Sequence, residues 1–275
     1  MGSFPVMATS IRASPHSEIG TELIRDWEPE DVPRAYIVLV HGLAEHCGRY
    51  ERTGALLADA GFQVRSFDLI GAGGSGGSRW DIDDWSRYHD QIGTHLEWAR
   101  GHGKPVVLMG HSLGGALCLG YLLSDRPQPD MAVLSAPALG GAAGWQKVLA
   151  PVLARFMPKV SIPNPVNGEH LSRDPAVAEA YFADPLVVTS SSVRFGAQLL
   201  GEIDRLNDEL SKLTVPTLVF HGEDDRLVPT RTSEPLGDVE CVDRKVYPGL
   251  RHETLNEPEG PAVVGDIVEW INSNL

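Results

Sequence analysis

Short, almost unbroken apolar runs alternate with amphipathic segments along most of this 275-residue chain. A run such as Tyr36–Val40 lacks the apolar–polar alternation of a half-exposed strand, and is typical of a strand buried on both faces of a parallel sheet. In the helix expected at about residues 84–100, apolar residues recur every three or four positions. This pattern predicts an α/β fold with a mostly parallel central sheet flanked by helices. Further strands are expected at residues 62–68, 105–109, 131–135, 217–221 and 242–247, and further helices at residues 50–60, 116–123 and 266–272.

The alternation is interrupted between about residues 138 and 213. This segment opens with a glycine-rich stretch at 139–144 and continues with apolar helical pieces and a run from Pro158 to Pro165. Helices are then expected at residues 176–181 and 195–206. We interpret the segment as a helical cap, or lid, inserted over the carboxyl ends of the strands; the alternative is a set of extra core helices packed on the sheet. The expected division is a core of residues 1–137 and 214–275 and a cap of residues 138–213.

The motif G-x-S-x-G occurs at Gly110-His111-Ser112-Leu113-Gly114, between an apolar strand and a helix-forming run. In this context it predicts a nucleophile elbow, a sharp strand-to-helix turn that strains the backbone of its serine and exposes the hydroxyl. Its glycines fit places where neighbouring chain passes too close for a Cβ atom. The following helix directs its positive end toward charge that develops near the serine. The alternative is a glycine-rich turn whose serine only caps a helix.

A serine hydroxyl becomes a good nucleophile when an imidazole takes its proton and a carboxylate orients that imidazole. In chains with this elbow, the acid and then the histidine follow the serine in sequence. Asp225 and His252 each follow an expected strand, at the sheet edge where such sites are built. Glu223 and Asp224 are alternative carboxylates, and Asp225 is favoured by its place before Arg226-Leu227-Val228. The alternative for His252 is an ordinary histidine of a surface loop.

Acyl transfer also needs hydrogen-bond donors for the oxyanion of the tetrahedral intermediate. One donor is expected to be the backbone N–H of Leu113, directly after the nucleophile. The other is expected in the loop after the first strand, which begins His41-Gly42-Leu43, with the backbone N–H of Leu43 as the candidate. His41 is expected to brace this loop rather than to react.

The run His41–Tyr50, HGLAEHCGRY, resembles the oxyanion loop of monoacylglycerol lipases, and the chain is especially similar to bacterial members. The resemblance extends from about Ala35 to the C-terminus and includes the expected cap. It implies an α/β-hydrolase fold with a lid that admits a single acyl chain. It also matches Glu45 and Arg49 to positions near the glycerol head group, although both residues equally fit a solvated pair at a helix start. The other matching motifs are residues 110–115, 172–175, 181–186, 225–229, 247–253 and 256–259.

Together, the triad and the resemblance predict a serine hydrolase that cleaves monoacylglycerols to fatty acid and glycerol through an acyl-enzyme. Apolar cap residues are expected to line the acyl tunnel or, alternatively, to pack the lid against the core; they are Leu149, Leu153 and Phe156. The nearest rival function is a broader carboxylesterase or a lysophospholipase with the same triad. A non-catalytic hydrolase-fold binding protein is more remote, because a binding module has no need of the triad.

One loop departs from the family pattern. The family usually carries D-x-R-G-H-G-x-S after the second of these parallel strands, whereas Asp68–Ser75 reads DLIGAGGS. We therefore expect the cluster that braces the oxyanion loop to be rearranged, with an effect on efficiency rather than on reaction type. Residues 71–76 also satisfy G-x-G-x-x-G, but the chain stays in a loop there instead of opening a helix. No nucleotide cofactor is expected, and no His or Cys spacing indicates a metal.

Composition limits the partners. The apolar fraction of 42% suits an ordinary globular core. The net charge of −14 argues against nucleic acid and against strong electrostatic docking on anionic lipid. Three widely spaced cysteines indicate a reducing compartment, and neither a signal peptide nor a membrane-spanning run is expected. We expect a cytoplasmic protein that binds a small lipid ester and whose cap makes weak peripheral contact with lipid surfaces; the oligomeric state does not follow from the sequence.

Overall fold

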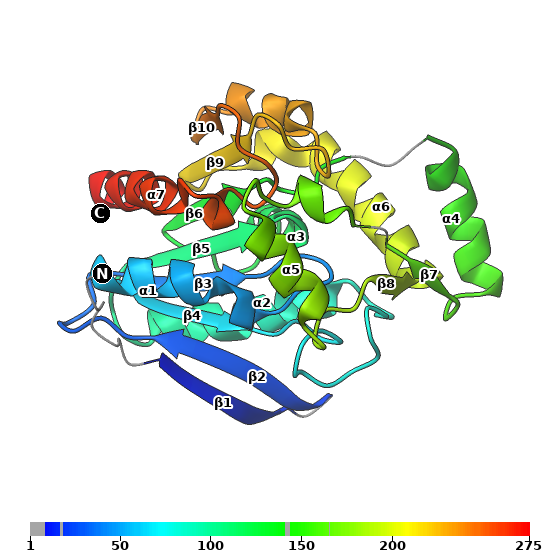
Figure 1. Cartoon of the computed structure of the whole chain (residues 1–275), viewed down its shortest axis with the longest axis horizontal. Coiled ribbons are helices and arrows are strands. Elements are labelled where there is room, and N and C mark those ends of the chain that lie inside the picture. The colour runs from blue at the N-terminus through cyan, green and yellow to red at the C-terminus, as the bar shows by residue number, and fades with distance from the viewer. Residues whose placement is uncertain (1–8, 17–18, 141–143, 165) are drawn as a thin grey trace.

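The computed structural model describes residues 9–16, 19–140, 144–164 and 166–275, which are built around one central sheet (Figure 1). In this part of the chain, eight strands form the sheet in the order β1–β2–β4–β3–β5–β6–β9–β10. The neighbours from β4 to β10 are parallel, whereas β2 is antiparallel to both β1 and β4. The prediction of a mostly parallel sheet is confirmed. The strands are β1 Thr9–His16, β2 Gly20–Trp27, β3 Tyr36–Val40, β4 Gln63–Phe67, β5 Val106–His111, β6 Met131–Ser135, β9 Thr217–Gly222 and β10 Val242–Tyr247.

Strand β3 shows why unbroken apolar runs form the centre of this sheet. All of its residues are buried. Ile37 and Leu39 pack in one apolar cluster with helices α1 and α7, whereas Val38 and Val40 pack in another with α2 and α3. Because side chains alternate along a strand, a strand covered on both faces needs apolar residues at every position. The covering helices are α1 Glu51–Asp59, α2 Ser86–Arg100, α3 Leu113–Leu122 and α7 Gly260–Asn274.

Helix α2 has the buried stripe that its sequence predicts. Tyr88, Ile92 and Leu96 are fully buried, at the spacing that places them on one helix face. Strands β6 and β10 also have the predicted bounds. The hairpin of β1 and β2 was not predicted, because β1 lies at the sheet edge with most of its residues exposed and has no clean alternation.

The segment that the sequence predicts to be a cap lies between β6 and β9, and it is called the cap below. It contains α4 Gly144–Phe156, β7 Ser161–Pro163, α5 Pro175–Ala183, β8 Ser190–Ser192 and α6 Val193–Glu209. Residues 141–143 of the predicted glycine-rich opening, and Pro165 at the end of the proline-bounded run, lie outside the described residues.

Helix α6 joins the cap to the core. Ser192 caps its N-terminus by accepting a hydrogen bond from the N–H of Phe195 at 3.0 Å. The ring of Phe195 is buried against Trp80 and Trp85. Helix α6 contacts α3 in the core and α4 in the cap, so α4 lies at the outer end of the molecule (Figure 1). Across the described ranges, no helix combines the length and apolar character needed to cross a membrane. That the cap moves as a lid stays a prediction.

Candidate active site

Ser112 occupies the turn between β5 and α3, where the backbone is strained. Its φ of 52° and ψ of −116° define a conformation that residues with a Cβ atom rarely adopt. Its N–H donates to the carbonyl of Ser135 at 2.9 Å, and its carbonyl accepts from the N–H of Ala116 at 3.0 Å. A Cβ atom at Gly114 would collide with the carbonyl of Val40. The strand–turn–helix context, the strain and the glycine are those of a nucleophile elbow.

Asp225 and His252 meet although 27 residues separate them in the chain. They lie in the loops after β9 and β10, and Nδ1 of His252 donates to Oδ2 of Asp225 at 2.6 Å. The other carboxylate oxygen accepts from the backbone N–H groups of Leu227 and Val228, each at 2.9 Å. Among the three consecutive acids of this loop, Asp225 is the buried one, whereas Glu223 and Asp224 are exposed. The geometry therefore selects Asp225 as the partner of His252.

The two groups also stabilise each other's charged forms. Burial alone would raise the pKa of Asp225, but the charge of His252 and the hydrogen bonds that the carboxylate accepts lower it well below its usual value. Burial likewise acts to lower the pKa of His252, and the carboxylate of Asp225 outweighs it, so that the pKa of His252 is raised above 6.5. Asp225 thus stays ionised, and His252 is a stronger base than a free imidazole.

Ser112 and His252 line one cavity of about 210 Å³ at the carboxyl ends of the parallel strands. Leu43, the candidate oxyanion donor, lines the same cavity, and Leu113 follows the nucleophile as the first residue of α3. A Cβ atom at Gly42 would lie 3.3 Å from Cβ of Ser112, so this loop passes directly beside the nucleophile. The cap contributes lining residues as well, namely Asn164, Val166, Leu171 and Tyr181.

Glu45 holds the oxyanion loop in place. One oxygen of its buried carboxylate accepts from the backbone N–H of Gly42 at 2.5 Å and from the hydroxyl of Tyr50 at 2.6 Å. The other oxygen accepts from Nη1 of Arg49 at 2.7 Å. Burial acts to raise the pKa of Glu45, but the charge of Arg49 and the other polar contacts lower it to about 2. Glu45 is therefore ionised, and it fixes the peptide that precedes Leu43.

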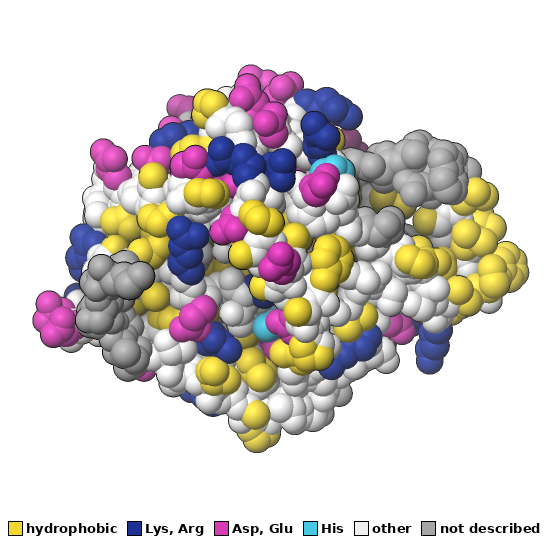
Figure 2. Space-filling view, viewed as in Figure 1, with side chains coloured by type: hydrophobic (Ala, Val, Ile, Leu, Met, Phe, Trp, Pro, Cys, Tyr) yellow, Lys and Arg dark blue, Asp and Glu magenta, His cyan; other side chains and the backbone are white. Residues whose placement is uncertain are grey.

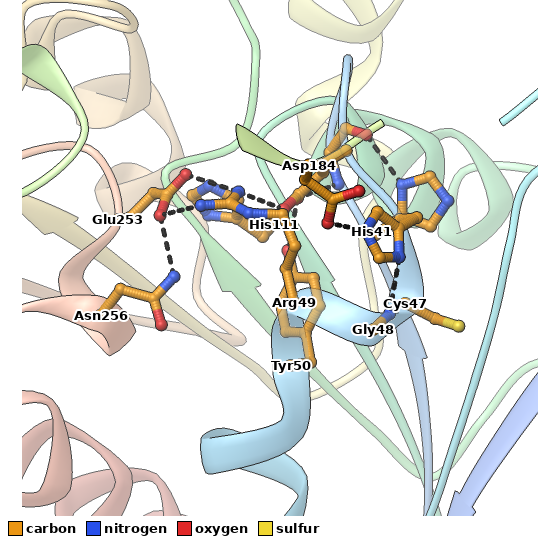
Figure 3. Close-up of polar contacts among 12 residues, drawn as sticks. His41, Cys47, Gly48, Arg49, Tyr50, His111, Asp184, Glu253 and Asn256 are labelled. Atoms are coloured by element: carbon orange, nitrogen blue, oxygen red, sulfur yellow. Dashed lines mark hydrogen bonds and ion pairs between the residues drawn. The ribbon is translucent and has the colours of Figure 1, made fainter. Parts of the chain in front are cut away.

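Arg49 ties this loop to the loop that carries His252. Its guanidinium makes two hydrogen bonds to the carboxylate of Glu253, at 2.8 and 2.9 Å (Figure 3). Glu253 also accepts from Nδ2 of Asn256 at 2.8 Å. The side chains of Glu45, Arg49, Tyr50, Glu253 and Asn256, called here the Arg49 network, therefore connect the oxyanion loop with the histidine loop. Glu45 and Arg49 also line the cavity, but their contact with substrate stays a prediction.

The cap and the core also meet at the histidine loop. The backbone N–H of Glu253 donates to the carbonyl of Leu171 at 2.8 Å, and that of His252 donates to the carbonyl of His170 at 3.3 Å. In the oxyanion loop, Nδ1 of His46 accepts from the N–H of Gly48, so Nε2 carries the proton and donates to Asp184 of the cap at 2.8 Å. The position of the cap is thereby linked to both loops of the site.

Comparisons with known proteins identify the family of the chain. The family model described as serine aminopeptidase, S33, matches residues 31–259. The chain is 36% identical over 266 residues to the monoacylglycerol lipase of Mycolicibacterium smegmatis, covering 93% of this chain and 95% of that protein. It is 32% identical to the human monoglyceride lipase, over 90% and 84% of the two chains. The crystal structure of Paleococcus ferrophilus monoacylglycerol lipase matches with a TM-score of 0.83 at 31% identity, over 92% of this chain and 98% of that chain.

The chain belongs to the monoacylglycerol lipase family. The predicted resemblance and the α/β-hydrolase fold are confirmed, and family membership makes the protein a carboxylic ester hydrolase. Among the residues that the structure describes, no three His, Cys, Asp or Glu side chains are grouped to hold a metal ion.

In the loop that departs from the usual lipase pattern, and in the oxyanion loop beside it, the side chains of His41 and Asp68 bond to backbone groups. Nδ1 of His41 donates to the carbonyl of Gly42 at 2.8 Å, and its Nε2 accepts from the N–H of Leu69 at 2.9 Å. The carboxylate of Asp68 accepts from the N–H groups of Cys47 at 2.8 Å and Gly74 at 2.6 Å. Where the family usually has arginine and histidine, the chain has Ile70 and Ala72, which are buried in the apolar core. The oxyanion loop is thus held without those two side chains.

The predicted tunnel residues Leu149, Leu153 and Phe156 lie away from the described lining of the cavity. They are 46%, 39% and 75% exposed, and Val152 between them is 53% exposed. These four residues, called here the outer α4 face, have the i, i+3, i+4, i+7 spacing of one helix face. The apolar helical pieces predicted in this part of the sequence lie in α4 and just after it, and in this conformation the outer α4 face is exposed to solvent (Figure 2). Their role in an acyl tunnel stays a prediction.

His221 is a second histidine whose side chain contacts Asp225, and the sequence analysis assigns it no role. It is fully buried, and its Nε2 lies 2.8 Å from the carbonyl of Val228 and 3.2 Å from Oδ2 of Asp225. Because a carbonyl only accepts, Nε2 carries a proton and donates toward both oxygens. Nδ1 lies 3.0 Å from the hydroxyl of Ser233. The only signal in the sequence is the spacing of four residues between His221 and Asp225, which is not informative at a strand end.

Proposed function

We propose that this protein hydrolyses the carboxylic ester of monoacylglycerols to a fatty acid and glycerol. The observation that carries the proposal is the buried Asp225–His252 pair, whose His252 lines the same cavity as the strained Ser112 in a chain of the monoacylglycerol lipase family. A strained serine beside an oriented imidazole is the arrangement that nucleophilic acyl transfer requires.

In the first half-reaction, Ser112 attacks the ester carbonyl while Nε2 of His252 takes the hydroxyl proton. Nδ1 of His252 is already bonded to Asp225, so Nε2 is the nitrogen that is free to act as the base. The backbone N–H groups of Leu43 and Leu113 stabilise the oxyanion. His252 then protonates the departing glycerol oxygen, and the acyl group remains on Ser112.

In the second half-reaction, water attacks the acyl-enzyme while His252 takes its proton. The tetrahedral intermediate collapses, the fatty acid leaves, and the proton returns to Ser112. Asp225 stays ionised throughout, consistent with its lowered pKa. Apolar lining residues of the cavity suit an acyl chain, and the charged pair Glu45 and Arg49 suits the glycerol hydroxyls; the apolar residues are Leu43, Val166, Leu171, Leu227 and Val228.

The outer α4 face gives the lipid substrate a route to the site. An amphipathic helix whose apolar face points outward binds at the boundary between water and lipid. Burial of side chains such as Phe156 in a lipid surface would remove apolar area from water, so that the cap makes peripheral contact where monoacylglycerol collects.

Turnover of matched substrates tests the proposal. The purified protein is given 1-monoacylglycerol, lysophosphatidylcholine with the same acyl chain, and short p-nitrophenyl esters, and kcat/KM is measured for each. We expect the highest value for the monoacylglycerol. A preference for the lysophospholipid or for the short esters would assign the rival carboxylesterase or lysophospholipase function.

A fluorophosphonate probe tests whether the site is catalytic at all. The probe should label the wild type at Ser112 and should not label Ser112→Ala. Equal labelling of both proteins, or labelling of neither, would favour a non-catalytic binding protein.

A further inference from the structure

Helix α2 places one amide side chain against the altered loop at residues 68–75. Gln91 is 3% exposed, on a helix whose apolar stripe is packed in the core. Its Nε2 donates to the carbonyl of Asp68 at 3.1 Å, and its Oε1 accepts from the N–H of Ile70 at 3.2 Å. Gln91 therefore holds the backbone on both sides of Leu69.

The surroundings of Gln91 require an amide rather than a carboxylate. Its Nε2 also donates to the buried carboxylate of Glu22 at 2.6 Å, so this nitrogen faces two acceptors while Oε1 faces a donor. An amide carries both kinds of atom and satisfies all three groups. Nε2 of His95 lies 3.1 Å from the same oxygen of Glu22. Burial acts to raise the pKa of Glu22, but the interactions with His95 and Gln91 outweigh it and lower the pKa. Glu22 is thus an ionised acceptor that fixes the orientation of the Gln91 amide.

Leu69 connects this support to the oxyanion loop. Its N–H donates to Nε2 of His41 at 2.9 Å, which leaves the proton of the imidazole on Nδ1. Burial lowers the pKa of His41, so the ring is neutral and keeps this tautomer. Nδ1 then donates to the carbonyl of Gly42 at 2.8 Å.

The carbonyl of Gly42 belongs to the same peptide group as the N–H of Leu43, the candidate oxyanion donor. Because a trans peptide group is planar, its C=O and N–H point in opposite directions, and a bond to the carbonyl sets the direction of the N–H. We infer that Gln91 is a positioning residue for the oxyanion hole. It acts on the N–H of Leu43 through Leu69 and His41. The inference rests on the proposed function, because it takes this N–H as a donor to the oxyanion.

Inhibitors with and without an oxyanion test the inference. Gln91→Leu removes the amide and keeps a side chain of similar size. On a soluble, short-chain monoacylglycerol, kcat should fall about tenfold with KM unchanged, because the oxyanion forms only during the reaction. A trifluoromethyl ketone with the same acyl chain forms a tetrahedral oxyanion on Ser112, so its inhibition constant should rise by the same factor. The matching 1-alkylglycerol ether has no carbonyl, and its inhibition constant should not change.

The matched control is His95→Leu. It removes the other hydrogen bond to Glu22 at an equally buried position, so it should lower the melting temperature as Gln91→Leu does. It should leave kcat and the inhibition constant of the ketone close to the wild-type values, because His95 bonds to Glu22 rather than to the backbone of residues 68–70. If Gln91→Leu does not fold, Gln91→Asn, which is one methylene shorter, should show the same pattern with a smaller loss.

A double variant tests the path through His41. His41→Phe alone should lower kcat about 10²-fold, because it releases the peptide that carries the donor. Adding Gln91→Leu should lower kcat no further, since the link through which Gln91 acts is already broken. Losses that multiply would show that Gln91 acts independently of His41 and would overturn the inference.

Three other outcomes would also overturn it: an unchanged inhibition constant for the ketone in Gln91→Leu, an equal rise for the ether, or an equal loss in the control. Turnover of a short p-nitrophenyl ester is measured in parallel. This ester uses the same oxyanion hole, so an equal loss of kcat on it supports the role of Gln91 even where the comparison of substrates rejects monoacylglycerol as the preferred ester.

Discussion

The charged residues that line the cavity have buried, bonded side chains, whereas the apolar residues of the outer α4 face are exposed. In the Arg49 network, the buried carboxylates of Glu45 and Glu253 are hydrogen bonded and share one guanidinium. On the outer α4 face, large apolar side chains are exposed to water. A buried ionic network tolerates little change, because removing one member leaves an uncompensated charge. An exposed face tolerates change well. We therefore expect substitutions in the Arg49 network to act on kcat, and substitutions in the cap to act on KM or on lipid binding.

The largest effect is expected from Asp225→Asn. The amide cannot stabilise the imidazolium that forms during the reaction and favours the wrong tautomer of His252, so kcat should fall by about 10⁴-fold. The matched control is Asp224→Asn, which changes an exposed neighbour and should leave kcat close to the wild-type value. Steady-state kinetics on a soluble ester measure both. A large loss in the Asp224 variant with a small one in the Asp225 variant would reassign the catalytic acid.

Glu45→Ala is expected to have the next largest effect. It removes the carboxylate that holds the N–H of Gly42, beside the candidate oxyanion donor, and a displacement of about 1 Å there costs about 10²-fold in rate. In Glu45→Gln the amide oxygen still accepts from Gly42, so the loss in kcat should be smaller. Circular dichroism checks that both variants are folded. If Glu45→Ala raised KM without lowering kcat, Glu45 would be a substrate contact rather than a brace.

Substitution of His221 should lower kcat less than the two substitutions above, and it should shift the pH profile of kcat/KM. His252 must be neutral to act as a base, so kcat/KM falls as the pH drops through its raised pKa, above 6.5. His221→Leu removes a hydrogen bond to Asp225, which should cost about tenfold in kcat. The less stabilised carboxylate then attracts the proton of His252 more strongly, so the acid limb of the profile should move to higher pH.

The control for this prediction is His221→Gln, whose Nε2 still donates near the same place and should restore both the rate and the profile. A purely structural role would lower the melting temperature of His221→Leu without moving the acid limb. A limb that stays in place, or that moves to lower pH, would therefore exclude His221 as a positioning residue for Asp225.

The sequence predicts the features that depend on neighbouring residues and leaves open those that depend on the folded chain. The elbow at Ser112 can be predicted from the sequence because its glycines, the preceding strand and the following helix are adjacent to it in the chain. For the catalytic acid, the sequence favours Asp225 by its place before Arg226-Leu227-Val228 but leaves Glu223 and Asp224 as alternatives, and only the contact with His252 decides among the three. The role of His221 depends on the same tertiary contact.

Helix α4 shows the other limit of prediction. Its periodicity indicates which side of the helix is apolar, but nothing in that pattern says whether protein, lipid or water covers that side. Leu149, Leu153 and Phe156 are predicted either to line an acyl tunnel or to pack the lid against the core, and both predictions cover this side of the helix. In the structure, the helix packs on α6 with this face outward. The spacing of apolar residues therefore predicts the helix but does not predict what covers its apolar side.

The smallest effect is expected where the two regions meet. Asp184→Ala removes the hydrogen bond between the cap and His46, and a partly exposed contact of this kind contributes about 0.5–1 kcal/mol. KM for monoacylglycerol should therefore rise about threefold while kcat is unchanged, because the cap is held less firmly over the cavity. Glu179→Ala, which removes an exposed carboxylate from α5, is the matched control and should leave KM unchanged. Hydrogen exchange gives a second measurement, since faster exchange across α5 in the Asp184 variant alone would link this contact to cap opening. A fall in kcat instead would mean that the pair orients the oxyanion loop, and that the cap is part of the catalytic framework rather than a separate cover.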